Sequence, residues 1–156
     1  MKLYLVQHGE AVAKNIDPGR PLSRQGEHDV QRMAGFLKKC NVALDKIMHS
    51  GKMRAHQTAE ILAEAVLIKG EIEAVKGVNP DDPVEDFSIV AHKLKQDTMV
   101  VGHLPFMSRM VSYLITGNPD RAVVAYKPGS IVCLERDAEQ YWQIQWMLRP
   151  DFLPRD

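Results

Sequence analysis

The chain opens with a short, continuous apolar run, Leu3-Tyr4-Leu5-Val6, which leads directly into Gln7-His8-Gly9-Glu10. Continuous apolar residues, rather than alternating ones, are typical of a strand that is covered by helices on both faces of its sheet. Similar short runs recur later in the chain. The pattern therefore predicts strands over residues 3–6, 46–49 and 98–101, with a further short strand over 71–75.

Between these runs, apolar residues recur at helical spacing and predict helices. Ser23 is the expected N-cap of the first helix, which Asn41 ends. A second helix is expected over 53–66, a third after Asp82 with Glu85 completing a capping box, and a fourth from Leu104-Pro105 to Gly117. Residues 131–134 and 142–146 read as a final antiparallel hairpin.

This order of elements predicts an α/β fold. We expect a three-layer sandwich with a mostly parallel central sheet, helices on both faces and the C-terminal antiparallel hairpin. The 156 residues are enough for one domain with its own core, so residues 1–156 are expected to form a single domain.

Charge and composition exclude several classes of partner. Lys and Arg total 20, as do Asp and Glu, so no overall basic field favours nucleic acid or an anionic membrane surface. The sequence contains neither a membrane-length apolar run nor a signal peptide, which leads us to expect a cytoplasmic protein. Cys40 and Cys133 are far apart and lack metal-ligand spacing, so we expect two reduced, buried thiols.

Histidines follow two of the predicted strands. His8 comes after the first strand, and His103 comes after the strand over 98–101. Ligands of open α/β sheets bind beyond the carboxyl ends of the strands. Arg54 falls in the first turn of a predicted helix, where a cation is normally unfavourable unless an anion shares the site. If the three strands are neighbours, His8, Arg54 and His103 meet at one edge.

Taken singly, each of these residues has a simpler interpretation. His8 alone would be a structural histidine in a turn, His103 a core residue and Arg54 a surface residue. A metal site built from the six histidines is not expected, because no His-x-x-x-His pair or carboxylate cluster supports one. Together, however, two imidazoles, a guanidinium and helix N-termini suit a phosphoryl group, which one imidazole attacks while the others neutralise its charge.

The chain also resembles a known family through four ordered motifs. They are Leu5-Val6-Gln7-His8-Gly9-Glu10-Ala11, Arg20-Pro21-Leu22-Ser23 with Gly26, Ser50-Gly51-Lys52-Met53-Arg54-Ala55-His56-Gln57-Thr58-Ala59, and Val100-Val101-Gly102-His103-Leu104-Pro105. These are similar to the motifs of the histidine phosphatase superfamily, which is phosphoglycerate mutase-like, and most similar to its short branch of SixA-type phosphohistidine phosphatases. The long inserts of the mutases are absent, which disfavours a mutase.

The resemblance implies roles for individual residues. His8 would be the catalytic nucleophile that becomes phosphorylated, with His103 and Arg54 as its catalytic partners. Gln7, Gly9 and Arg20 would join Arg54 and His103 in binding the phosphate. The implied activity is a phosphatase that acts through a phosphohistidine enzyme intermediate on a phosphorylated protein or a small phosphorylated substrate. It needs no metal and no cofactor.

One position departs from the family pattern. The family usually has an arginine before the nucleophilic histidine, and this chain has Gln7. A glutamine amide donates a hydrogen bond but brings no charge, so a catalytically weakened phosphate- or phosphoprotein-binding module is the alternative. Glu10, Asp81 and Asp82 are candidate general acids by position. A phosphohistidine substrate depends less on such an acid than a phosphoester does.

Overall fold

The computed structural model describes residues 1–155, and it contains one six-stranded sheet with the order β3-β2-β4-β1-β5-β6. The first four of these strands are parallel to one another, β5 runs antiparallel to β1, and β6 runs antiparallel to β5. In chain order the strands are β1 (Lys2–Gln7), β2 (Lys46–His49), β3 (Ile72–Ala74), β4 (Thr98–Gly102), β5 (Ile131–Arg136) and β6 (Trp142–Leu148). The mostly parallel sheet with its terminal hairpin is as predicted.

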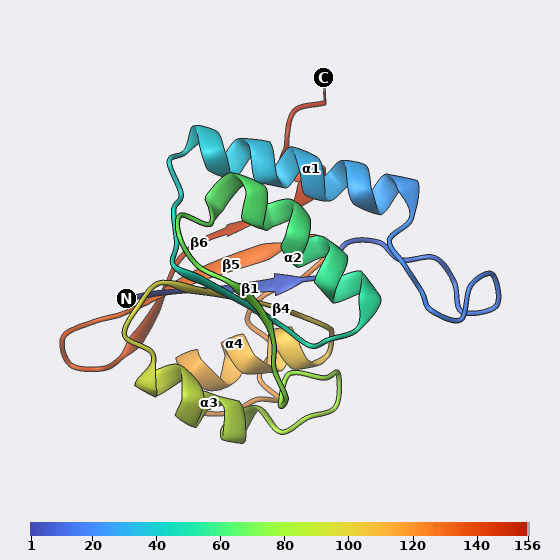
Figure 1. Ribbon diagram of the computed structural model, residues 1–156. Coiled ribbons are helices and arrows are strands. Elements are labelled where there is room, and N and C mark those ends of the chain that lie inside the picture. The colour runs from blue at the N-terminus through green and yellow to red at the C-terminus, as the bar shows by residue number, and fades with distance from the viewer. Residues whose placement is uncertain (156) are drawn as a thin grey trace.

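Helices cover both faces of the sheet, which confirms the three-layer arrangement (Figure 1). One face carries α1 (Arg24–Lys39) and α2 (Met53–Val66), and the other carries α3 (Val84–Lys93) and α4 (Phe106–Thr116). A short 3-10 helix, η1 (Pro150–Phe152), follows β6 and contacts α1.

Alternate residues of β1 enter different cores, as the strand geometry requires. Tyr4 and Val6 join the cluster under α1 and α2, whereas Leu3 and Leu5 join the cluster under α3 and α4. Each of these four side chains is at most 3% exposed, so β1 is buried on both faces. The continuous apolar run that predicted this strand therefore reflects burial on both faces of the sheet, as expected.

The strand register brings three chain segments to one edge of the sheet. Gln7 at the end of β1 is paired with Gly102 at the end of β4, and His49 at the end of β2 is paired with Val101. The chain leaves all three strands in the same direction. Residues 8, 50 and 103 are therefore delivered side by side.

Helix α1 begins as the sequence predicted, whereas α3 does not. The Ser23 hydroxyl accepts a hydrogen bond from the Gly26 N–H and so caps α1. At α3 the N-cap is Pro83, which supplies no side-chain cap, and Asp82 Oδ2 instead accepts the Asn79 N–H at 2.9 Å. The predicted capping box is therefore wrong, because the turn before the helix takes the Asp82 carboxylate.

The cysteine prediction is half right. Cys133 is fully buried in β5, but Cys40 is exposed at the end of α1. The two thiols are free. Cys40 is exposed because it follows the last turn of the helix, beyond the stripe of α1 that faces the sheet.

A loop of residues 12–21 projects from the same edge of the sheet as the ends of β1 and β4 (Figure 1). Ala11 and Leu22 are joined by an antiparallel bridge at the base of this loop. No helix among the described residues is long and apolar enough to cross a membrane.

Candidate active site

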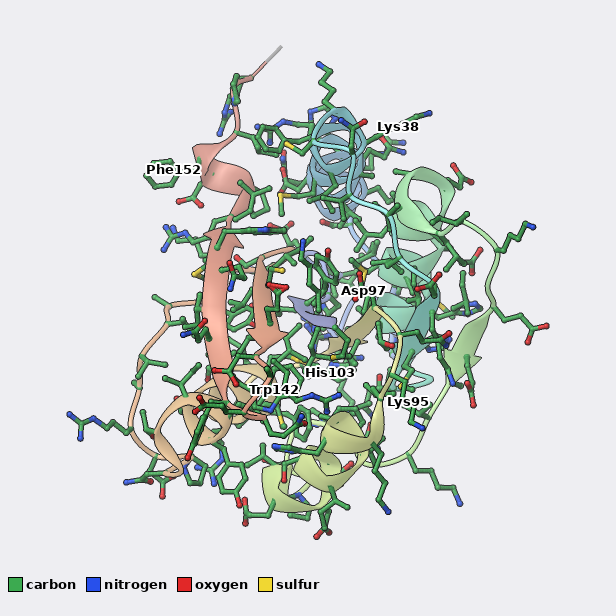
Figure 2. The ribbon with its side chains drawn as sticks, turned by 90° about the vertical axis from the view of Figure 1, so that its left-hand side faces the viewer. Lys38, Lys95, Asp97, His103, Trp142 and Phe152 are labelled. Atoms are coloured by element: carbon green, nitrogen blue, oxygen red, sulfur yellow. The ribbon has the colours of Figure 1, made fainter. Side chains whose placement is uncertain are left out.

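His8 and His103 face each other at the carboxyl ends of β1 and β4. Their ring centroids are 5.0 Å apart, and both side chains are buried. The His8 N–H donates to the Gly102 carbonyl at 3.0 Å, which continues the β1–β4 pairing into the site. Figure 2 shows His103 inside the molecule, whereas Lys38 and Phe152 lie at its periphery.

The hydrogen bonding of His8 defines which ring nitrogen is free. Its Nδ1 lies 2.6 Å from the Gly9 carbonyl oxygen. Because a carbonyl only accepts, Nδ1 must carry the hydrogen and donate it. In the neutral ring the Nε2 lone pair is then available for attack on an electrophile.

The surroundings of His8 keep its ring neutral at physiological pH. The pKa of His8 is lowered from 6.5 to about 4, mainly by burial and also by the positive charges of Arg54 and Arg20, against the opposing effect of the Gly9 carbonyl. A neutral imidazole is the nucleophilic form. His8 therefore has both the protonation state and the tautomer that nucleophilic catalysis needs.

His103 is held on one side only. Its Nε2 lies 2.7 Å from the Ser50 hydroxyl, and its buried Nδ1 has no hydrogen-bond partner among residues 1–155. The pKa of His103 is lowered to about 3, mainly by burial and also by the charges of His8, Arg54, Lys52 and Arg20. An anion bound among these cations would reverse that effect and favour protonation of His103.

Two arginines bring positive charge to the pair of histidines. Arg54, in the first turn of α2, is half-buried, and its Nε has no partner in the described part of the chain. Burial and the neighbouring charge of Arg20 both lower the pKa of Arg54. Two guanidinium groups that repel each other across an open site are stabilised by an anion between them.

Arg20 reaches the site from the loop of residues 12–21 in an unusual backbone conformation. Its φ is 48°, in the left-handed region that non-glycine residues rarely occupy. The Arg20 Nε donates to the Val12 carbonyl at 3.1 Å, which fixes the side chain against the loop. Backbone strain of this kind costs about 1–3 kcal/mol and persists where the surrounding structure holds it.

Helix α2 holds the segment after His8 in place through two adjacent side chains. The Thr58 hydroxyl accepts the Gly9 N–H at 3.0 Å and donates to the Arg54 carbonyl at 2.8 Å. Gln57 Oε1 accepts the Leu22 N–H at 2.8 Å. Thr58 therefore connects the residue after His8 directly to the backbone of Arg54.

Gly9 has a packing role that the sequence did not reveal. A Cβ at Gly9 would lie 2.8 Å from Val30 Cγ2, so this glycine allows the loop to pass close to α1. Its N–H is already bonded to Thr58. A role of Gly9 in phosphate binding remains a prediction, and its N–H would have to exchange partners to fulfil it.

Gln7 is the last residue of β1 and directly precedes His8. Its side chain is 8% exposed, and its buried Oε1 has no hydrogen-bond partner among the described residues. An unpaired buried amide oxygen costs free energy unless a donor reaches it. The amide is therefore free to bond to a group that enters the site.

The candidate general acids are engaged elsewhere or exposed. Glu10 Oε1 accepts the Ser23 hydroxyl at 2.8 Å, Asp82 is bonded to Asn79, and Asp81 is exposed. Residues 1–155 hold no group of three His, Cys, Asp or Glu side chains that could bind a metal. A cavity of about 420 Å³ lies at the opposite edge of the sheet, lined by Tyr4, Phe36 and Trp146 among others. Its lining is mainly apolar and does not suit an anion.

Sequence comparison matches the histidine phosphatase superfamily (branch 1) over residues 3–76. The chain is also 23% identical to phosphohistidine phosphatase SixA of Escherichia coli over 155 residues, which covers 96% of this chain and 94% of that protein. Residues 3–76 are therefore similar to the histidine phosphatase superfamily, and nearly the whole chain is similar to SixA.

Solved structures share the fold of this chain. The protein histidine phosphatase SixA complexed with tungstate has a TM-score of 0.86 at 22% identity, covering 97% of this chain and 98% of that one. An alpha-ribazole-5'-P phosphatase of Escherichia coli, described as putative, has a TM-score of 0.76 at 18% identity, covering 96% and 98%. These two likenesses establish the fold.

The sequence identified four of the charged or aromatic side chains around the site but missed two hydroxyl groups. Ser50 and Thr58 are members of the third motif, but the sequence assigned neither of them a role in the site. Both bond to residues far away in the chain, His103 and Gly9. The position of Ser50 at the end of a buried strand was the one local signal available.

Proposed function

We propose that this chain is a phosphatase that forms a phosphohistidine intermediate on His8 and acts on phosphohistidine or another small phosphorylated group. One observation carries the proposal. His8 donates from Nδ1 to the Gly9 carbonyl, which leaves Nε2 free opposite His103 and within the field of Arg54 and Arg20.

The proposed reaction has two displacements. His8 Nε2 attacks phosphorus, the substrate P–N bond breaks, and the substrate imidazole leaves as a neutral ring because its other nitrogen carries a proton. Water then attacks the phosphorus on His8, the Nε2–P bond breaks, and inorganic phosphate is released. Arg54, Arg20 and His103 stabilise the charge on the equatorial oxygens in both steps.

A phosphoramidate suits this site better than a phosphoester does. An alkoxide needs a proton as it leaves, whereas a protonated phosphohistidine releases neutral imidazole. Glu10 and Asp82 accept hydrogen bonds from Ser23 and Asn79, Asp81 is exposed, and no hydrogen bond among the described residues holds any of the three carboxyl groups against His8 or His103. Phosphohistidine is accordingly the favoured substrate class.

The test is to trap the intermediate. Wild-type protein is mixed with a ³²P-labelled phosphohistidine protein and quenched in alkali, which preserves phosphohistidine. We expect label on the wild type and on His28→Ala, whose histidine is exposed on α1, and none on His8→Ala. Turnover that survives His8→Ala contradicts the assignment of the nucleophile. Hydrolysis of phosphoserine peptides without hydrolysis of phosphohistidine contradicts the substrate class.

A second function, phosphate or phosphoprotein binding without turnover, is favoured by Gln7. The neutral amide stands where the family usually has an arginine, and charge-assisted contacts to phosphate are the stronger ones. Tight phosphate binding with no label on wild-type protein would select this alternative.

A further inference from the structure

The turn after β2 supplies the one hydrogen bond that the His103 ring makes among residues 1–155. Ser50 follows β2, His103 follows β4, and these strands are adjacent. The Ser50 Oγ to His103 Nε2 distance is 2.7 Å, whereas His103 Nδ1 has no partner. The orientation of this buried ring therefore depends on a single hydroxyl group.

The position of that hydroxyl is fixed by the neighbouring residues. Gly51 has a φ of 89°, a conformation that strains any residue with a side chain. Its N–H donates to His49 Nδ1 at 3.0 Å, so the His49 ring closes the turn two residues ahead as an Asn or Asp side chain does in an Asx turn. Lys52 N also points at Ser50 Oγ, at a longer 3.4 Å.

The His49 ring is itself held in place. It is 5% exposed and stacks on the His56 ring, with centroids 4.7 Å apart and an interplanar angle of 10°. His56 Nε2 lies 2.9 Å from Glu60 Oε1 on the next turn of α2. A continuous set of contacts thus runs from α2 through His49 and the turn to His103.

We propose that Ser50 is a positioning residue that orients the His103 imidazole for the transferred phosphoryl group, and that His49 holds Ser50 in place through the Gly51 N–H. This inference rests on the proposed phosphatase function. A serine hydroxyl both donates and accepts, so it follows His103 whether or not the ring is protonated. An alanine at position 50 would leave both ring nitrogens without a partner in the described protein.

The test compares Ser50→Ala with Ser50→Thr, which keeps the hydroxyl. Loss of one hydrogen bond to an otherwise unpaired ring should lower kcat by about tenfold in Ser50→Ala, with little change in KM. Ser50→Thr should stay within about twofold of the wild type. Ser112→Ala is the matched control, because that buried serine bonds only within α4, to the Ser108 carbonyl. We expect the control to match wild-type kcat.

The His103 ring ¹⁵N signals in NMR provide a readout that does not need turnover. They should shift in Ser50→Ala and remain in place in Ser50→Thr and Ser112→Ala. If the wild type has no turnover but the His103 signals still shift in Ser50→Ala, the proposed phosphatase function is refuted and the positioning of His103 by Ser50 is supported. Unchanged kcat and unchanged signals in Ser50→Ala would overturn the inference, and so would an equal loss in Ser50→Thr.

The part of the proposal that concerns His49 has its own pair of variants. His49→Asn offers a side-chain oxygen that can accept the Gly51 N–H, whereas His49→Phe keeps a ring to stack on His56 but has no acceptor. We expect His49→Phe to reproduce the kcat loss and the His103 signal shift of Ser50→Ala. His49→Asn should retain wild-type values. If His49→Phe leaves the His103 signals in place, His49 does not position Ser50.

Discussion

At the scale of single residues, Gln7 is the position that most directly affects how strongly the proposed site would stabilise a transferring phosphoryl group. It is buried at the end of β1, directly before His8, and its Oε1 is unpaired within the described chain. Arg54 and Arg20 already supply positive charge nearby, as their effect on the pKa of His8 shows. The Gln7 amide can therefore form a directional hydrogen bond, but it adds no positive charge to that of Arg54 and Arg20.

Gln7→Arg should raise turnover of an activated phosphate substrate, because it adds a cation beside the developing charge. By analogy with loss of one oxyanion donor, the gain is expected to reach on the order of a hundredfold in kcat, about 3 kcal/mol. Steady-state kinetics of the wild type, Gln7→Arg and Gln7→Arg with His8→Ala measure it. The last variant should have no turnover. Unchanged kcat in Gln7→Arg would mean that Arg20 or Lys52 already fills this role.

At the scale of elements, α2 aligns several parts of the site at once. Its first turn carries Arg54, Thr58 bonds to Gly9 beside the nucleophile, and Gln57 bonds to Leu22 at the base of the projecting loop. These contacts link α2 to segments 35 and 49 residues away in the sequence. Movement of α2 would therefore displace several site groups together.

Thr58→Val tests this arrangement, since valine has the same shape without the hydroxyl. The buried Gly9 N–H would lose its partner, which costs about 1–3 kcal/mol of stability. We expect a matching fall in the free energy of unfolding by urea and a lower kcat. Thr58→Ser keeps the hydroxyl and should retain most of the wild-type free energy of unfolding and of the wild-type kcat. Equal stability of Thr58→Val and the wild type would show that the Gly9 N–H finds another partner.

The sequence predicted these elements better than it predicted the contacts between them. Buried parallel strands show as continuous apolar runs such as Leu3 to Val6, and a capping serine such as Ser23 acts on its own helix, so both are local signals. The Ser50–His103 bond spans 53 residues and exists because β2 and β4 are adjacent. The spacing of residues along the chain does not give the order of strands in the sheet. The two histidines could be predicted because each follows its own strand, whereas the Ser50 hydroxyl was missed because its contact depends on which strands are adjacent.

At the scale of the whole molecule, two buried histidines make stability depend on pH. The folded state lowers the pKa of His8 from 6.5 to about 4 and that of His103 to about 3. Between these values and 6.5, the unfolded chain binds more protons than the folded one, so stability rises with pH. Acid should therefore destabilise this protein well before the site histidines charge in the folded state.

We expect the free energy of unfolding to fall as pH drops from 6.5 towards 4, by up to about 3 kcal/mol for each histidine. Urea unfolding at a series of pH values measures this fall. His8→Asn removes one of the titrating groups and should make the dependence shallower, whereas His28→Asn, at an exposed position, should not. A flat stability profile over this interval would contradict the burial of neutral His8 and His103.

The bridge between Ala11 and Leu22 joins the two ends of the projecting loop, so the loop begins and ends at the same place in the fold. Residues 12–19 can therefore be lengthened, shortened or replaced without moving the backbone on which His8 stands, since loop closure costs only about 0.6 kcal/mol per doubling of length. This loop is therefore a suitable place to insert other sequences. Libraries of sequence inserted between Val12 and Arg20 would sample new substrate selectivity while His8, Arg54 and His103, which lie outside the loop, keep their positions.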